Sequence, residues 1–260
     1  METIITDPSS FFFPRSSQAE LYADGLQRGG IVNLSSGLFL AAPAGTGKTT
    51  FLTRDLMPEL ARRDVIAIYV DLSDSGTEPK RDPIVDAIAA AIRESYGGRQ
   101  PPFDLDAVGH SGGATLASAL TALVEHTDRQ IALIVDEAEI ACRSAAGTDT
   151  LFALKAARDS FIGGKRRRQL VFAGSDRRQL GFMVNGYREP FLGASLFDLP
   201  LLDRDFTDAL CAWMNRQRPS ANQLKPEILW TQFEQCGYQP RGVIGSNALK
   251  TVRLPVGDAL

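Results

Sequence analysis

The chain has 260 residues, of which 44% are hydrophobic and 23% are charged. These fractions exclude a disordered or fibrous protein, and the length allows one large α/β domain with a small satellite. The net charge of -3 argues against nucleic-acid binding through bulk electrostatics, although a local basic patch is compatible with it.

The cysteines and the N-terminal sequence indicate the compartment. Cys142, Cys211 and Cys236 are an odd set without Cys-x-x-Cys spacing, which favours neither a disulfide framework nor a zinc site. Residues 1–8 lack the basic start and long apolar run of a signal peptide, and no apolar stretch approaches the roughly 20 residues that span a bilayer. We therefore expect a soluble, cytoplasmic protein with no membrane partner.

The first predicted part of the chain, residues 1–36, is an N-terminal segment with a helix that leads into the core. It contains the aromatic run Phe11-Phe12-Phe13. Such a run can insert into a membrane, but packing of a short aromatic cluster onto the protein is the favoured interpretation.

A glycine-rich loop follows the apolar run 37–40 and precedes a predicted helix. Gly45 and Gly47 have no Cβ, so the backbone can turn its N–H groups inward around a phosphate, at the positive end of the helix dipole. Lys48 is expected to bridge the β- and γ-phosphates of a nucleotide, and Thr49 to hold Mg²⁺. The expected nucleotide-binding residues of the loop are Pro43, Ala44, Gly45, Thr46, Gly47, Lys48, Thr49 and Thr50.

One position of this loop departs from the usual Gly-x-x-x-x-Gly-Lys-[Ser/Thr] pattern. Ala42 occupies the place of the first glycine. Only a positive φ demands glycine, so alanine is acceptable if the position keeps a negative φ.

The next elements alternate between helix and strand. A helix is predicted over 49–60, with Pro58 marking a bend or an early end. Val65–Asp71 is a continuous apolar run, typical of a parallel strand buried on both faces. Asp82 and Pro83 start an amphipathic helix, residues 96–113 form a surface loop, and a second helix covers 114–126.

Two carboxylates follow the buried strand predicted over 131–135. In open α/β sheets, ligands bind at the carboxyl ends of the strands. Asp136 is expected to bind the Mg²⁺ held by Thr49, directly or through a water molecule. Glu137 is expected to polarise a water for attack on the γ-phosphate, and general-base help of this type is worth about 10²–10⁴ in rate. An acidic strand end hydrated by solvent is the alternative, but the preceding loop favours a catalytic pair.

The same pair indicates which reaction takes place. A kinase must exclude water, so a water-activating glutamate favours hydrolysis over phosphotransfer. No Asn-Lys-x-Asp sequence that reads guanine occurs in the chain, so ATP is the expected nucleotide.

A helix over 151–161 and a strand over 169–173 come next. If this strand lies between the loop strand and the acidic strand, Ser175 falls near the γ-phosphate and can orient the attacking water; a simple turn is the alternative. Arg177 and Arg178 are surface residues, ion-pair partners or charges that reach a nucleotide on a neighbouring subunit, and Arg177 is the candidate catalytic residue of the two.

Two further basic features of the sequence each allow two interpretations. The run Lys165-Arg166-Arg167-Arg168 is either a solvated turn, which is the favoured interpretation, or a contact to a phosphate backbone. Arg241 either contacts the γ-phosphate or is a solvated residue at a helix start. His110 and His126 are isolated and make no metal site.

The strand pattern ends after a short apolar segment at 194–199. Alternation of strands and helices up to this point predicts a parallel sheet, so we expect an α/β core over 37–202. A small helical subdomain is expected over 203–260, with helices at 206–214, 226–235 and 241–252.

Together these motifs resemble the P-loop ATPases with an additional strand and a catalytic glutamate, the group that contains AAA+ and STAND-type ATPases. Residues 42–49 resemble their Walker A motif, 134–137 their Walker B motif and 172–175 their sensor-1 strand. The resemblance implies a three-layer α/β/α fold with a mainly parallel five-stranded sheet of order 5-1-4-3-2, and it favours a catalytic role for Ser175.

The sequence thus predicts a protein that hydrolyses Mg-ATP to change the position of its helical subdomain or its assembly, with a protein partner or self-association. One alternative is a nucleotide-dependent interaction module with negligible turnover. Another is a DNA-associated ATPase that uses residues 165–168.

Overall fold

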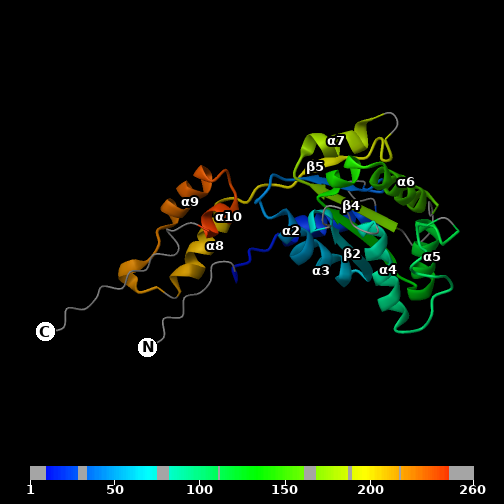
Figure 1. The fold of residues 1–260 in the computed structure, drawn as a ribbon. Helices are drawn as coiled ribbons and strands as arrows, with labels where there is room; N and C mark the ends of the chain where they lie inside the picture. The colour runs from blue at the N-terminus through cyan, green and yellow to red at the C-terminus, as the bar shows by residue number, and fades with distance from the viewer. Residues whose placement is uncertain are drawn as a thin grey trace. The chain divides into compact units, whose positions relative to one another are not determined.

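The computed structural model describes residues 10–28, 34–74, 82–110, 112–160, 168–186, 189–216 and 218–245 (Figure 1). The chain divides into two compact units. The larger comprises residues 15–43 and 49–199, and the smaller comprises residues 1–14, 44–48 and 200–260.

A parallel sheet forms the centre of the larger unit. Its strands are β1 (Leu38–Ala41), β2 (Val65–Asp71), β3 (Gln130–Asp136), β4 (Arg168–Gly174) and β5 (Leu196–Asp198). They lie in the order β2-β3-β4-β1-β5, and every pair in the described chain is parallel. Read from the other edge this is the order 5-1-4-3-2, so the predicted fold class is confirmed.

The strand register brings the predicted site residues to one edge of the sheet. Ala41 is paired with Gly174, and Val135 is paired with Phe172. Strand β4 therefore lies between β1 and β3, the arrangement on which the expected role of Ser175 depends. The carboxyl ends of all three strands meet at the same edge.

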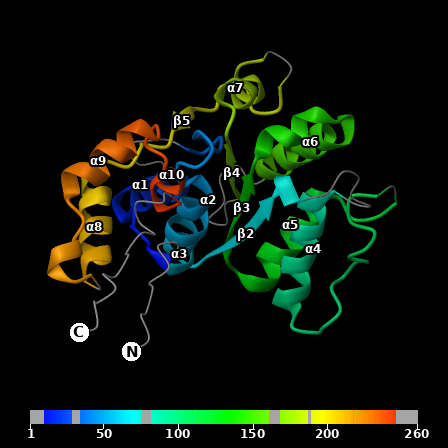
Figure 2. The same cartoon turned by 60° about the vertical axis from the view of Figure 1, so that its left-hand side comes forward.

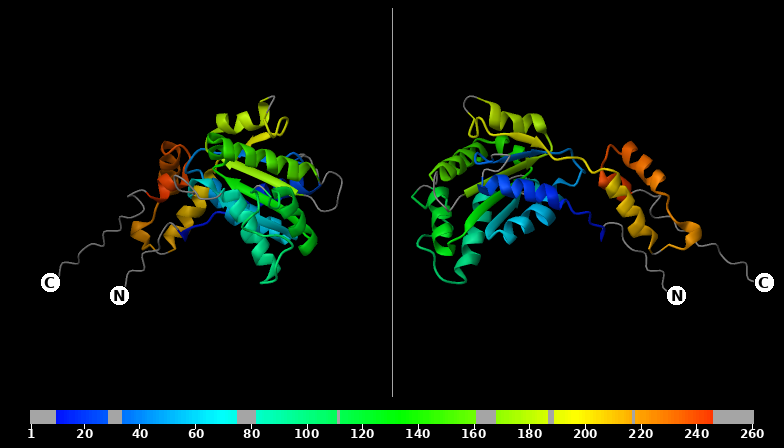
Figure 3. Two further views of the ribbon diagram at one scale, coloured as in Figure 1. Left: turned by 45° about the vertical axis from the view of Figure 1, so that its right-hand side comes forward. Right: turned by 180° about the vertical axis from the view of Figure 1, so that it is seen from behind.

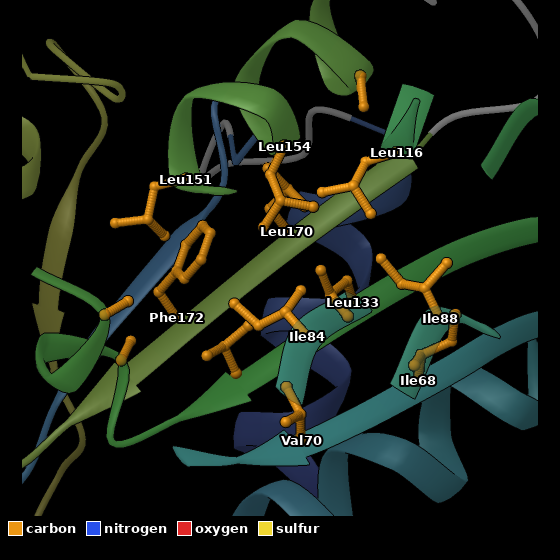
Figure 4. Packing of buried hydrophobic residues seen from close by; sticks show 14 of the residues in the cluster. Ile68, Val70, Ile84, Ile88, Leu116, Leu133, Leu151, Leu154, Leu170 and Phe172 are labelled. Atoms are coloured by element: carbon orange, nitrogen blue, oxygen red, sulfur yellow. The ribbon is translucent and has the colours of Figure 1, made fainter. Parts of the chain in front are cut away.

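Helices cover both faces of this sheet (Figures 2 and 3). One face packs against α4 (Pro83–Tyr96), α5 (Leu116–Thr127), α6 (Ala145–Asp159) and α7 (Arg177–Asn185). The other face packs against α1 (Ser16–Arg28) and the helical stretch that follows the glycine-rich loop. Figure 4 shows the first face, where Phe172 and Leu170 of β4 lie beneath Leu151 and Leu154 of α6. Both apolar layers keep water from the sheet.

The helix after the loop does not end at Pro58. It begins as α2 (Lys48–Thr50), widens into a π-helix over Phe51–Leu56 and continues as α3 (Met57–Arg62). The N–H of Met57 donates to the carbonyl of Leu52, five residues earlier. Pro58 thereby falls in the first turn of α3, where a missing N–H has little cost, so the expected bend or early end is replaced by a π-helical turn.

Strand β2 is less buried than its sequence predicts. Ile66, Ala67 and Tyr69 are partly exposed. The reason is its position, because β2 is an edge strand with β3 as its neighbour. An apolar run alone does not distinguish an edge strand from a central one.

Short polar side chains set the starts of several helices. Asp82 accepts a hydrogen bond from the N–H of Ile84, as expected for the start of α4. Ser144 caps α6 through the N–H of Gly147, so this helix begins six residues before the predicted start at 151. Residue 161, its predicted end, lies outside the described residues. Helix α7 was not expected, and it begins where Asp176 accepts the N–H groups of Arg178 and Gln179.

The smaller unit contains α8 (Arg204–Asn215), the 3₁₀ turn η5 (Ser220–Asn222), α9 (Pro226–Gln235) and α10 (Pro240–Ile244). Phe206, Leu210 and Phe233 lie in its core. Phe11 and Phe13 pack against Phe206, with ring centroids 6.0 and 5.9 Å apart, which agrees with the favoured interpretation of the aromatic run. Residues 246–252 of the predicted last helix lie outside the described residues. In the part of the chain that is described, no helix has the length and apolar character that a membrane crossing requires.

Candidate nucleotide site

The glycine-rich loop has the backbone that its sequence predicts. Gly45 and Gly47 have φ angles of 81° and 90°, in the region that favours glycine. Ala42 does not have a positive φ, which explains why alanine is tolerated at this position. Thr46 and Lys48 of the loop are buried, with 2% and 5% of their surface exposed.

Within the smaller unit, the start of α10 approaches this loop through Gln239. A Cβ at Gly45 would lie 3.2 Å from Oε1 of Gln239. Arg241, the residue expected to reach the nucleotide, is exposed on α10. Sequence reasoning missed Gln239 because glutamine at a helix start carries no specific signal.

Three donors hold the carboxylate of Asp136, which is fully buried. Its Oδ2 accepts the hydroxyl of Thr49 at 2.7 Å and the hydroxyl of Tyr69 at 3.2 Å. Its Oδ1 accepts the N–H of Glu137 at 3.0 Å. Thr49 and Asp136, which the sequence assigns to one Mg²⁺ site, are therefore in direct contact in the larger unit.

Tyr69, on the edge strand β2, was not predicted as a site residue. Burial and then the neighbouring Asp136 raise the pKa of its hydroxyl, because both disfavour the phenolate. The neutral hydroxyl is therefore favoured, and this is the form that donates to Asp136.

Glu137 leaves the end of β3 in a left-handed conformation, with φ 51° and ψ 42°. This conformation is unfavourable for a residue with a Cβ, and it is typical of functional sites. The carboxylate oxygen Oε2 of Glu137 accepts the hydroxyl of Ser175 at 3.0 Å. The structure thus brings Glu137 and Ser175, two of the candidate site residues, into contact.

A third carboxylate, Glu139, lies at the same strand ends and was missed by sequence reasoning. It is 2% exposed and sits in the short 3₁₀ segment η4 (Ala138–Arg143) that follows Glu137. Its Oε1 accepts the N–H and the hydroxyl of Ser175, each at 3.0 Å. A glutamate two residues after Glu137 gives no sequence signal of burial, since acidic residues are mostly exposed.

The structure shows the contacts of Arg177 and Arg178, for which the sequence allowed several alternatives. Arg177 forms an ion pair with Asp198 of β5 at 2.6 Å, with both side chains more than half exposed. Arg178 lies over the ring of Phe182. These contacts place both residues on the surface of the larger unit.

Arg168 differs from the expectation of a basic solvated turn or phosphate contact. It begins β4, is 5% exposed and donates to the carbonyl of Ala157 and the hydroxyl of Thr121. Burial lowers the pKa of its guanidinium to about 10. Arg168 therefore cannot contact a phosphate backbone, and residues 165–167 lie outside the described residues.

The oxygens of Thr49 and Asp136 suit Mg²⁺, which prefers oxygen ligands and keeps several waters and phosphate oxygens in its shell. No group of three or more His, Cys, Asp or Glu side chains with metal-binding geometry occurs in the described residues.

Comparison with known proteins agrees with this geometry. A family model described as AAA domain matches residues 34–179. A search of curated proteins gives no match.

Three solved structures are similar in fold. The Walker-type ATPase of Pyrococcus abyssi is 17% identical with a TM-score of 0.61, and the match covers 90% of this chain and 66% of that protein. Aeropyrum pernix ORC2, in ADPNP-ADP complexes, is 17% identical with a TM-score of 0.60, and the match covers 90% of this chain and 62% of that protein. Aeropyrum pernix ORC1 in complex with DNA is 16% identical with a TM-score of 0.55, and the match covers 92% of this chain and 59% of that protein. The chain thus spans less than two thirds of each of these proteins.

Proposed function

This chain belongs to the AAA domain family, and we propose that it binds ATP with Mg²⁺ and hydrolyses it. The AAA+ part of the sequence resemblance is thereby confirmed, whereas the STAND-like part stays a prediction. The observations that support the proposal are the contacts Thr49–Asp136 and Glu137–Ser175 at one edge of the sheet. In the sequence, Thr49 directly follows a loop in which Gly45 and Gly47 have positive φ angles.

The proposed mechanism assigns a task to each group. The N–H groups of the loop and the ammonium of Lys48 bind the β- and γ-phosphates. When bound, Mg²⁺ neutralises charge on the phosphate oxygens, and Thr49, oriented by Asp136, would hold it. Glu137 accepts a proton from water as the water oxygen bonds to the γ-phosphorus. The β–γ bridging bond then breaks, giving ADP and phosphate.

Binding of Mg-ATP tests this proposal most directly. Lys48→Ala removes a charge-assisted contact worth about 1.5–3 kcal/mol, so we expect affinity to fall ~10- to 100-fold in titration calorimetry. Lys155→Ala is the matched control, because Lys155 lies on α6 and pairs with Asp159. Absence of binding heat in the unaltered protein, or equal heats in it and the Lys48 variant, would contradict the proposal.

The output of hydrolysis is proposed to be a change in the position of the C-terminal helices or in assembly. Grouping of the loop segment 44–48 with these helices in one compact unit supports this idea, since phosphate contacts could then bias their position. We also propose a cytoplasmic location, on the basis of the unpaired cysteines Cys142, Cys211 and Cys236.

Self-association would give Arg177 a role. Its ion pair with Asp198 is exposed and worth about 0–1 kcal/mol, so the guanidinium can be recruited by a nucleotide on a second copy. We expect turnover per chain to rise severalfold with protein concentration, and Arg177→Ala to remove this rise while Asp198→Ala keeps it. Phosphate release measured across a dilution series checks this, and turnover that does not depend on concentration would exclude the role.

DNA association remains a second candidate. One structure similar in fold is of ORC1 in complex with DNA, but a likeness at 16% identity supports the fold alone. Burial of Arg168 removes one of the four charges on which the candidate depends.

A further inference from the structure

The hydroxyl of Ser175 lies between two carboxylates and has one hydrogen to give. Its Oγ is 3.0 Å from Oε2 of Glu137 and 3.0 Å from Oε1 of Glu139. Ionised carboxylates only accept hydrogen bonds, so the hydroxyl serves one of them at a time. When one carboxylate accepts this hydrogen, the other is left without a hydrogen bond from the Ser175 hydroxyl.

Backbone N–H groups hold the Glu139 carboxylate next to the Ser175 hydroxyl. Its Oε1 also accepts the N–H groups of Ser175 and Asp176, at 3.0 and 3.3 Å. Its Oε2 is buried without a hydrogen-bond partner and lies against Gly174, where a Cβ would overlap it. The carboxylate is thus lodged against the end of β4, and glycine at position 174 provides the space.

The two carboxylates differ in their access to water. Glu139 is 2% exposed, so the protein rather than the solvent must supply the donors to its carboxylate. Glu137 is partly exposed, so water can donate to it. A buried acceptor loses more from an absent donor than a hydrated one does, which directs the Ser175 hydrogen towards Glu139.

We propose that Glu139 is a positioning residue that draws the Ser175 hydrogen away from Glu137. The Glu137 carboxylate then accepts a proton from the attacking water, rather than a hydrogen bond from Ser175. The inference rests on the proposed hydrolysis and adds to it a residue that acts through Ser175 without touching the substrate.

Glu139→Gln tests the inference with little change of shape. The amide oxygen still accepts the N–H groups of Ser175 and Asp176, but a neutral acceptor is weaker than a carboxylate, so the hydroxyl turns to Glu137. We expect kcat to fall about tenfold, a part of the 10²–10⁴ that a general base supplies, with KM for Mg-ATP unchanged.

Ser175→Ala provides the decisive background. Without the hydroxyl there is no hydrogen to compete for, so Glu139→Gln is expected to change kcat by less than about twofold there. An equal loss in both backgrounds would show that Glu139 only supports the fold, and would overturn the inference. Melting temperatures of all four proteins accompany the measurement.

Gly174→Ala perturbs the same contact from the other side. The added Cβ displaces Oε2 of Glu139, so kcat should again fall in the unaltered background and change little with Ser175→Ala. If the unaltered protein has no turnover, the proposed function fails. If it turns over and both changes act equally in the two backgrounds, only the present inference fails.

Discussion

Glu137→Gln is expected to lower the rate of phosphate release about 10²–10⁴-fold while ATP stays bound. The amide has the size of the carboxylate and can still accept the Ser175 hydroxyl, so the strand ends keep their arrangement. It cannot take a proton from water, because its nitrogen and carbonyl oxygen are weak bases. The expected result is a protein that binds Mg-ATP and holds it unhydrolysed.

The measurement is steady-state phosphate release, paired with calorimetry of Mg-ATP binding. Glu94→Gln is the matched control, since Glu94 is exposed on α4. This experiment also separates the two classes of function. Equal, negligible rates in the unaltered protein and the Glu137 variant would reject hydrolysis and favour a nucleotide-dependent interaction module.

Local sequence was sufficient for the features that depend on neighbouring residues. Gly45 and Gly47 can adopt their positive φ angles because they lack a Cβ. The start of α4 follows from Asp82 and Pro83, which act within one helical turn. Asp136 lies at a strand end because the apolar run before it stops there.

The missed residues depend on contacts between segments far apart in the chain. Tyr69 and Asp136 are 67 residues apart, and Glu139 and Ser175 are 36 apart. Their approach follows from the pairing of β2 with β3 and of β3 with β4. Sequence patterns of one element contain no information on this register, so neither contact could be predicted.

Arg168 illustrates a related limit. A run of four basic residues is typical of a solvated surface. The structure instead places its last member, Arg168, in β4, where the carbonyl of Ala157 in α6 and the hydroxyl of Thr121 in α5 accept hydrogen bonds from Nη1 and Nη2 of the guanidinium. Charge in the sequence predicts exposure only when such acceptors are absent, and tertiary packing determines whether they are present.

Asp136→Asn is expected to raise the Mg²⁺ concentration needed for hydrolysis about 10²-fold, since a metal supplies several kcal/mol of charge stabilisation. Both oxygens of Asp136 accept hydrogen bonds, so an asparagine must turn its NH₂ either to the N–H of Glu137 or to the hydroxyls of Thr49 and Tyr69. The second orientation is less costly, because hydroxyls can rotate and accept. It turns the Thr49 hydroxyl from a donor to Asp136 into an acceptor, which uses one of the two lone pairs of this oxygen, and it also removes the negative charge beside the metal site.

Asp71→Asn is the matched control for this change. Asp71 is paired in register with Asp136 at the end of the neighbouring strand, but its carboxylate accepts the N–H and hydroxyl of Ser73. Magnesium titrations of phosphate release should therefore differ strongly between the two variants, and nucleotide-free melting curves will report any loss of folding. An equal rise in both variants would mean that negative charge at the sheet edge matters in general, and that the contact between Asp136 and Thr49 has no special part in binding the metal.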